Sequence, residues 1–145
     1  MFDLHSHILY GLDDGARTLE ESVEMVQVAA KDGIKMMLAT PHSKDVQESD
    51  ALDLITNRID ELNEKALSEG LDIKIVCGME NHLTVDLHDL VQAGKGYSIN
   101  KNKYILVELP FGHYPDYTND VLFQLQLQGL TPLIAHPERQ DNIQK

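Results

Sequence analysis

The sequence lacks most features of secreted, membrane and nucleic-acid-binding proteins. A single cysteine, Cys77, excludes an internal disulfide framework. No apolar run approaches the length of a membrane span, and the N-terminus lacks a basic segment followed by an apolar one. Only 12 Lys and Arg oppose 24 Asp and Glu, and the net charge of −12 argues against non-specific binding of nucleic acid. We therefore expect a cytoplasmic globular protein with no membrane insertion and no nucleic-acid partner.

Several common catalytic motifs are also missing. The sequence has neither a glycine-rich Walker loop nor a dinucleotide-binding fingerprint, and no Gly-x-Ser-x-Gly motif surrounds Ser6. A cysteine phosphatase needs an arginine six positions after its thiolate, but Leu83 is the residue six positions after Cys77. Cys77 lies in an apolar run, where packing is its expected role. These absences argue against nucleotide-loop chemistry and against a nucleophilic cysteine.

The apolar pattern alternates between short β-type runs and longer helical ones. Strands are expected at residues 2–5, 36–40, 73–77, 104–109 and 131–135. Helices are expected between Thr18 and Gly33, from about Asp50 to Glu69, near 85–93 and at 116–128. Thr18 and Glu21 have the spacing of a capping box. This alternation predicts one α/β domain over residues 1–145 with a parallel sheet, either doubly wound or a barrel.

A histidine or glutamate lies at or just after the end of every expected strand. These residues are His5, His7, His42, Glu80, Glu108 and His136. In parallel α/β folds the carboxyl edge of the sheet collects ligand-binding residues. Glu108 lies in an apolar strand, and glutamate is rarely buried unless it is paired or ligates a metal. Imidazole and carboxylate together suit Zn²⁺, Mn²⁺ or Fe²⁺, so the pattern predicts a polynuclear metal site.

The neighbours of these residues leave some roles open. The Asp3 carboxylate either orients a ligating imidazole or caps the local backbone. Arg139 either binds a phosphate oxygen or forms an ion pair with Glu138. His82 and His88 are interpreted as solvated side chains rather than as ligands. His113 is expected on a loop near Glu108, where it either touches substrate or has no functional role, and the second interpretation is preferred.

The motifs that carry these residues resemble one family over essentially the whole chain. They are the runs 3–9 and 11–16, Thr40-Pro41-His42, Gly78-Met79-Glu80, 107–110 and 134–139. In order and spacing they are similar to the PHP (polymerase and histidinol phosphatase) superfamily. Within it they look most like the bacterial manganese-dependent tyrosine-protein phosphatases of capsule and exopolysaccharide operons. The resemblance implies a distorted TIM-like barrel and a metal-dependent phosphatase.

The same resemblance implies a set of metal ligands. Up to three divalent metals are expected, with Mn²⁺ first and Fe²⁺ or Zn²⁺ as alternatives. By the family pattern, His5, His7 and Glu80 hold the first metal, and Glu80 bridges to a second metal held by Glu108 and His136. Asp14 and His42 belong to the third metal, with Asp13 as the alternative to Asp14.

The family pattern extends beyond the length of this chain. It continues with further strands and an Asp-x-His motif that supplies ligands, so this sequence is expected to be either a fragment or a truncated product. We therefore expect an incomplete barrel of about five βα units. The exposed edge of its fifth strand would favour either association, including a homo-oligomer, or partial disorder.

The implied reaction is metal-assisted hydrolysis of a phosphomonoester, with direct attack by an activated water. The implied substrate is the phosphotyrosine-containing C-terminal tail of a bacterial tyrosine kinase that regulates capsular or exopolysaccharide synthesis. One alternative is a PHP phosphatase for a small phosphomonoester such as histidinol phosphate. The other is a non-catalytic module that binds metal or docks to the kinase.

Overall fold

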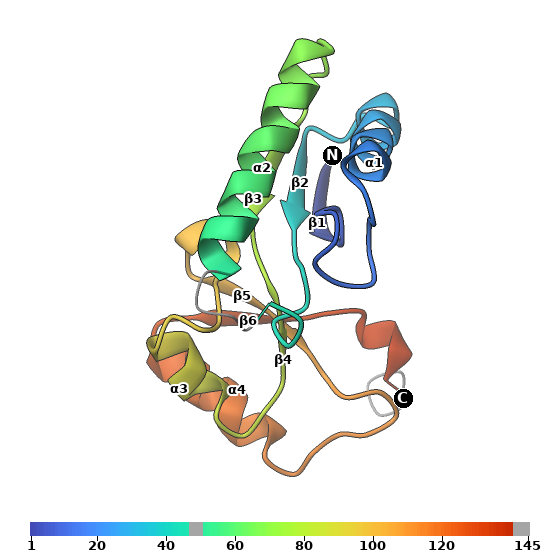
Figure 1. The fold of residues 1–145 in the computed structure, drawn as a ribbon. Helices are drawn as coiled ribbons and strands as arrows, with labels where there is room; N and C mark the ends of the chain where they lie inside the picture. Colours follow the sequence, from blue (N-terminus) through green and yellow to red (C-terminus); the bar gives the residue numbers. More distant parts are fainter. Residues whose placement is uncertain (47–50, 141–145) are drawn as a thin grey trace. The chain divides into compact units, whose positions relative to one another are not determined.

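The computed structural model describes residues 1–46 and 51–140, and these residues form two compact units (Figure 1). The N-terminal unit consists of Met1–Pro41 and Asp45–Cys77. The C-terminal unit consists of His42–Lys44 and the chain from Gly78 onwards. Each unit has its own three-stranded parallel sheet. None of the helices in the described part of the chain has the length and apolar character needed to cross a membrane.

The N-terminal unit is built from two β-α repeats and a third strand. Its sheet has the order β1 (Phe2–Ser6), β2 (Met36–Ala39) and β3 (Lys74–Cys77). The connecting helices are α1 (Leu19–Lys31) and α2 (Ala51–Ser68), and α2 packs against both β3 and α1. Its largest fully buried side chains include Ile8, Leu9, Leu38, Ile55, Leu62 and Ile75. This apolar core fixes the sheet edge that carries His5 and His7.

Helix α1 begins and ends where its capping residues predict. The Thr18 hydroxyl accepts the backbone N–H of Glu21 at 3.3 Å. In return, the Glu21 carboxylate accepts the backbone N–H of Arg17 at 2.7 Å, which satisfies a second donor at the helix start. Gly33 follows the helix with a φ of +83°, a conformation that glycine adopts without strain.

The C-terminal unit has a second sheet with the order β4 (Glu80–His82), β5 (Tyr104–Glu108) and β6 (Thr131–Ile134). Its helices are α3 (Leu87–Gln92) and α4 (Thr118–Leu127), and its two 3₁₀ turns are η1 (Ile99–Lys101) and η2 (Pro137–Arg139). Helix α4 packs against β6 and α3. The apolar core consists of Leu83, Leu87, Ile105, Val107, Leu109, Val121 and Leu125.

The α/β class with parallel sheets is therefore confirmed, but the strand count is corrected. The described residues contain six strands rather than five, because β4 follows β3 after only Gly78 and Met79. Three residues are too few to show the alternation by which a strand is recognised in a sequence. Asp50, the expected start of the second helix, lies outside the described residues.

Candidate metal centre

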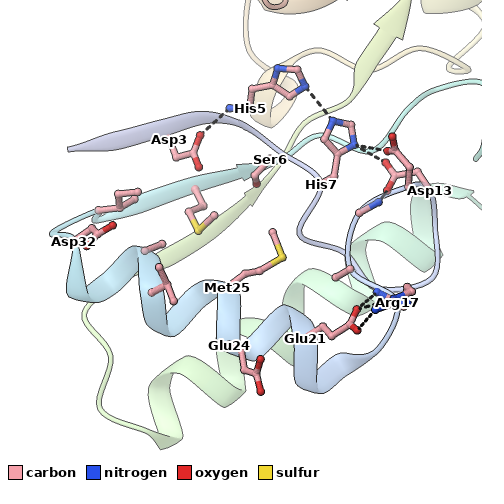
Figure 2. Close-up of a pocket in the computed structure, with 17 residues that line it drawn as sticks. Asp3, His5, Ser6, His7, Asp13, Arg17, Glu21, Glu24, Met25 and Asp32 are labelled. Atoms are coloured by element: carbon pink, nitrogen blue, oxygen red, sulfur yellow. Dashed lines mark hydrogen bonds and ion pairs between the residues drawn. The ribbon is translucent and has the colours of Figure 1, made fainter.

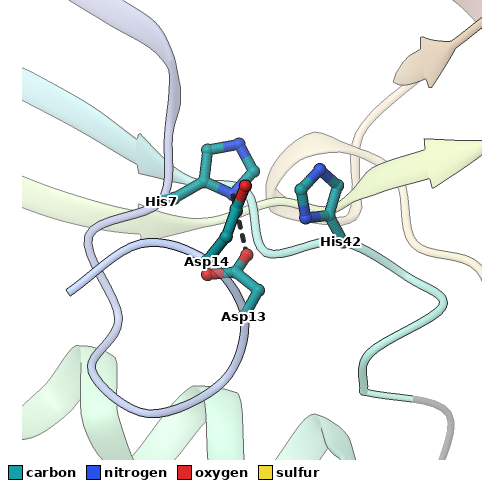
Figure 3. Close-up of side chains that lie close together, drawn as sticks. All are labelled: His7, Asp13, Asp14 and His42. Carbon is teal, nitrogen blue, oxygen red and sulfur yellow. Dashed lines mark hydrogen bonds and ion pairs between the residues drawn. The ribbon is translucent and has the colours of Figure 1, made fainter. Parts of the chain in front are cut away.

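The N-terminal unit brings together a group of side chains that we call the first cluster: His5, His7, Asp13 and Asp14. Strand β1 supplies His5, and His7 follows its last residue. Their Nε2 atoms lie 3.2 Å apart. Nδ1 of His7 lies 2.7 Å from the Asp13 carboxylate and 3.7 Å from that of Asp14 (Figure 3). The ligand atoms of His7, Asp13 and Asp14 all lie within 4.8 Å of one another.

The contact between His7 and Asp13 determines where the His7 proton lies. An ionised carboxylate can only accept, so Nδ1 of His7 must carry the proton in this hydrogen bond. In the neutral ring Nε2 then presents a lone pair, which is the form of imidazole that binds a metal. A carboxylate on the far nitrogen of a ligating histidine is the usual way in which such a ring is oriented. Asp13 therefore orients the His7 imidazole, which is one of the two roles that the sequence suggested for Asp3.

The two neighbouring aspartates of the first cluster differ in burial. The Asp13 side chain is 1% exposed, and its second carboxylate oxygen accepts the backbone N–H of Gly15 at 3.0 Å. The Asp14 side chain is 78% exposed. Asp13 is thus fixed by the loop, whereas Asp14 reaches into solvent beside His7.

Asp3 has the second of the two roles that the sequence left open. Its carboxylate accepts the backbone N–H of His5 at 3.1 Å, so it caps the local backbone (Figure 2). It also lines a hollow beside β1 and α1 whose charged lining is mostly acidic. The carboxylates of this lining are Asp3, Asp13, Asp14, Glu21, Glu24 and Asp32, and Arg17 is its one full cation. Such a lining favours the entry of cations.

The Arg17 guanidinium is paired with Glu21, which sits at the start of α1. The hydrogen bonds from the backbone N–H and the side chain of Arg17 lower the pKa of Glu21 below its usual value. Both groups are exposed and both line the hollow.

The C-terminal unit contains the second cluster: His42, Glu80, Glu108 and His136. Glu80 opens β4 and forms an isolated parallel bridge with His42, and Glu108 is the last residue of β5. His136 follows β6 with a φ of +30°, an uncommon conformation for a residue with a side chain. Glu80 therefore follows β3, as the sequence pattern predicted, and also begins β4.

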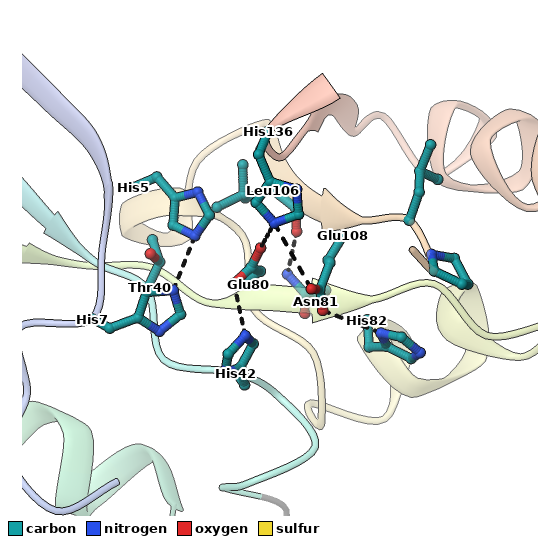
Figure 4. A network of polar contacts seen from close by, with 12 residues as sticks. His5, His7, Thr40, His42, Glu80, Asn81, His82, Leu106, Glu108 and His136 are labelled. Carbon is teal, nitrogen blue, oxygen red and sulfur yellow. Dashed lines mark hydrogen bonds and ion pairs between the residues drawn. The ribbon is translucent and has the colours of Figure 1, made fainter. Parts of the chain in front are cut away.

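The second cluster is the more buried of the two, and its polar contacts are drawn in Figure 4. Glu80 is 1% exposed and Glu108 is 4% exposed. Nε2 of His42 lies 3.2 Å from one Glu80 oxygen, and Nε2 of His136 lies 3.0 Å from the other. The same nitrogen of His136 is 3.8 Å from Glu108. One imidazole nitrogen thus faces two buried carboxylates, and it carries at most one proton to share between them.

His82 is a residue whose place the sequence analysis missed. We interpreted it as solvated, but its Nδ1 lies 3.2 Å from the second carboxylate oxygen of Glu108, and its side chain is about one-third exposed. Glu80 and His82 are two residues apart on β4 and so point to the same side of the strand. That spacing was present in the sequence, but without a recognised strand it carried no weight.

Arg139 lies on η2, three residues after His136, and both side chains contact the ring of Phe111. The His136 imidazole stacks on this ring with centroids 5.6 Å apart and an interplanar angle of 18°. The Arg139 guanidinium lies 4.8 Å from the ring centroid. The Gln140 amide donates to the carbonyl oxygens of Leu109 and Pro110, which joins η2 to the loop after β5.

Both donor sets fit a divalent metal of borderline softness. Each combines imidazole nitrogens with carboxylate oxygens, which is the ligand set of Mn²⁺, Fe²⁺ and Zn²⁺ sites. Two carboxylates buried as deeply as Glu80 and Glu108 need positive charge beside them, because an uncompensated buried charge is costly. The fold and the two clusters thus define an α/β protein with side chains suited to binding divalent metal ions.

The chain belongs to the family described as Capsular polysaccharide synthesis, CpsB/CapC, whose model matches residues 1–145. It is 34% identical over 145 residues to the tyrosine-protein phosphatase YwqE of Bacillus subtilis (strain 168), covering 100% of this chain and 57% of the relative. It is 31% identical over 139 residues to the putative tyrosine-protein phosphatase CapC of Staphylococcus aureus, covering 96% and 54%. The family resemblance expected from the motifs is confirmed.

A solved structure gives the same result. It comes from work on YwqE from Bacillus subtilis and CpsB from Streptococcus pneumoniae, described there as unique metal-dependent tyrosine phosphatases. It matches with a TM-score of 0.92 and 35% identity, over 99% of this chain and 58% of that one. The chain therefore spans somewhat more than half the length of the relatives it matches.

Proposed function

We propose that this chain is the metal-binding part of a protein-tyrosine phosphatase of the cytoplasm. Its proposed substrate is phosphotyrosine in the C-terminal tail of a bacterial tyrosine kinase that regulates capsular or exopolysaccharide synthesis. The observation that carries the proposal is the pair of buried carboxylates, Glu80 and Glu108, facing the imidazoles of His42 and His136. Membership of the CpsB/CapC family supports the substrate class, because the relatives are named as tyrosine phosphatases.

We assign metal ligation to both clusters. The proposed ligands are His5, His7, Asp14, His42, Glu80, Glu108 and His136. Mn²⁺ is the proposed metal, with up to three ions in the complete enzyme, and Fe²⁺ or Zn²⁺ would fit the same donors. When bound, such metals activate water near neutral pH and offset the charge of the phosphate oxygens. The distorted TIM-like barrel and a homo-oligomer remain predictions.

Three side chains would assist from beside the ligands. Asp13 holds the proton on Nδ1 of His7 and so presents Nε2 of that ring as a lone pair. His82 contacts Glu108 and limits the rotation of its carboxylate. Arg139 provides a permanent positive charge three residues after His136, and Phe111 restricts its guanidinium, so we propose that it binds a phosphate oxygen of the substrate.

The test is hydrolysis of a phosphotyrosyl peptide with Mn²⁺ either present or chelated. This chain would be compared with a version extended to the length of its relatives, and each would also carry Glu108→Gln or His136→Gln. We expect manganese-dependent turnover in at least the longer chain, lost in both variants with far-UV circular dichroism unchanged.

Each contrary outcome would identify a specific error. Turnover that survives in both variants would refute the assignment of the second cluster. Turnover on histidinol phosphate but not on the peptide would favour the small-metabolite phosphatase. Metal uptake without turnover on either substrate, in both chain lengths, would favour a non-catalytic module.

A further inference from the structure

The loop between β1 and α1 carries Asp13 and Asp14, and helix α2 holds this loop from outside the first cluster. Tyr10 lies in the loop, three residues after His7 and three before Asp13. Its hydroxyl donates to the Glu61 carboxylate at 2.8 Å. The Arg58 guanidinium lies over its ring, 4.4 Å from the centroid, and donates through Nη1 to its carbonyl oxygen. We call Tyr10, Arg58 and Glu61 the Tyr10 clamp.

The three members of the clamp act on one short stretch of chain. Arg58 and Glu61 are three residues apart on α2 and so lie on one face of the helix. A Cβ on the next loop residue, Gly11, would lie 4.0 Å from both terminal nitrogens of Arg58. The hydrogen bond to Glu61 and partial desolvation raise the pKa of Tyr10, so its phenol stays protonated and remains a donor. One arginine thus contacts both the ring and the carbonyl of Tyr10, and its guanidinium lies close to the next residue of the loop.

The held stretch connects directly to the ligand-bearing part of the loop. The backbone N–H of Gly11 donates to the carbonyl of Ala16 at 2.8 Å, and that of Ala16 donates to the carbonyl of His7 at 3.1 Å. The loop is therefore closed on both sides of the aspartates. On its inner side the buried side chains of Ile8 and Leu9 anchor it in the core. Away from this core, the clamp holds the loop through the side chain and the carbonyl of Tyr10.

We propose that Arg58, with Tyr10 and Glu61, is a positioning residue for the metal ligands of the first cluster. The inference rests on the proposed metal-binding function and extends it to side chains that do not themselves face the cluster. Asp13 is buried and short, so a small shift of residues 10 and 11 changes the direction from which it reaches His7. The Asp14 side chain is exposed and must become ordered when it binds a metal. If the clamp already restrains the loop, this ordering loses less conformational entropy.

The experiment is an NMR titration of the 145-residue chain with Mn²⁺, comparing wild type, Arg58→Met, Tyr10→Phe and Lys35→Met. Paramagnetic broadening of the Gly15 amide, the residue after Asp14, reports Mn²⁺ bound near the first cluster. Hydrogen exchange of the Gly11 and Ala16 amides reports the order of the loop. Lys35→Met is the matched control, since it removes one cation and one ion pair, with Asp72, in the same unit without touching the loop.

We expect Arg58→Met to raise the Mn²⁺ concentration for half-broadening of Gly15 about tenfold, the lower end of losses for outer-shell partners of a metal site. Exchange of Gly11 and Ala16 should accelerate in the same variant. Tyr10→Phe, which loses only the bond to Glu61, should give a smaller change of the same sign. If Arg58→Met does not fold, the test is the comparison of Mn²⁺ affinity and amide exchange between Tyr10→Phe and Lys35→Met.

The possible failures are distinct. If Mn²⁺ does not broaden Gly15 in the wild type, the proposed metal function of the first cluster is wrong. If the wild type binds but Arg58→Met and Tyr10→Phe bind equally well, the clamp does not position the ligands. Faster exchange with unchanged Mn²⁺ affinity would give the clamp a role in loop stability only, and would also overturn the inference.

Discussion

At the scale of single residues, burial separates groups that look alike in the sequence. Glu108 could be singled out beforehand because a carboxylate inside an apolar strand needs a partner. Asp13 and Asp14 could not be distinguished in this way, since they are adjacent and chemically identical. Only the path of the loop makes Asp13 the buried partner of His7 and leaves Asp14 exposed. For neighbouring identical residues, the structure therefore adds a difference in burial that their chemistry does not reveal.

Gly15 offers a direct test of how tightly the first cluster is packed. A Cβ at this position would overlap the carbonyl oxygen and Cβ of His7. We predict that Gly15→Ala costs about 1–3 kcal/mol of stability by overpacking and also weakens Mn²⁺ binding. Urea unfolding and Mn²⁺ titration measure the two effects.

The control for that substitution is Gly33→Ala. Gly33 has a φ of +83° and nothing within 4 Å of the added Cβ, so the variant should lose stability through backbone strain while keeping its Mn²⁺ affinity. Unchanged metal affinity in Gly15→Ala would show that the loop can move away from His7 without disturbing the ligands.

At the scale of elements, β4 shows how a very short strand can organise a site. Asn81 lies between Glu80 and His82 and is 0% exposed. Its amide nitrogen lies within hydrogen-bond distance of the carbonyls of Met79, Tyr97 and Leu106, and its oxygen accepts the N–H of Tyr97. The hydrogen bonds of the buried Asn81 side chain thus add to the few backbone hydrogen bonds that so short a strand can form.

The isosteric change Asn81→Asp should reveal this role. It would place a carboxylate among three carbonyl oxygens, so we predict a loss of about 3 kcal/mol or more in the free energy of unfolding. Chemical denaturation followed by circular dichroism measures it. Asn119→Asp, at a residue whose side chain accepts the Tyr114 hydroxyl on the surface, is the control and should be near neutral. Equal effects of the two variants would contradict the proposed network.

Helix α1 supplies a pH-dependent contribution. The pKa of Glu21 lies below its usual 4.5 because its carboxylate accepts hydrogen bonds from the backbone and side chain of Arg17. The folded state therefore binds this proton less readily than the unfolded state, so the stabilisation is present above pH 4.5 and is lost as the pH falls through the folded pKa. Glu21→Gln should lower stability at pH 7 and converge with wild type under acid. A constant difference from pH 7 to pH 3 would exclude this linkage.

The longer elements could be predicted and the shortest could not. The capping box at Thr18 and the helical spacing of its successors located α1 to within a residue or two, because each signal is local. Strand β4 was missed for the opposite reason: its pairing with β5 depends on residues more than twenty positions away. His82 was misinterpreted as solvated as a consequence, since only the strand brings it to Glu108.

At the scale of the whole molecule, the motifs predicted the family and the α/β class, and both are confirmed. Order and spacing of the His and Glu motifs carried that prediction because they depend on the chain as a whole. The motifs could not predict which side chains position the ligands without binding metal themselves. Arg58 is separated from His7 in the sequence by the whole of α1 and β2 and by the first two turns of α2, and no local pattern marks it.

The central claim is that both clusters bind divalent metal, and equilibrium dialysis of the chain against Mn²⁺ tests it most directly. Wild type would be compared with His7→Gln, Glu108→Gln and, as a control, the exposed Glu64→Gln on α2. We predict more than one Mn²⁺ per wild-type chain, a loss of bound Mn²⁺ in each of the two ligand variants, and no loss in the control. Equal Mn²⁺ content in all four proteins, or none in the wild type, would contradict the account.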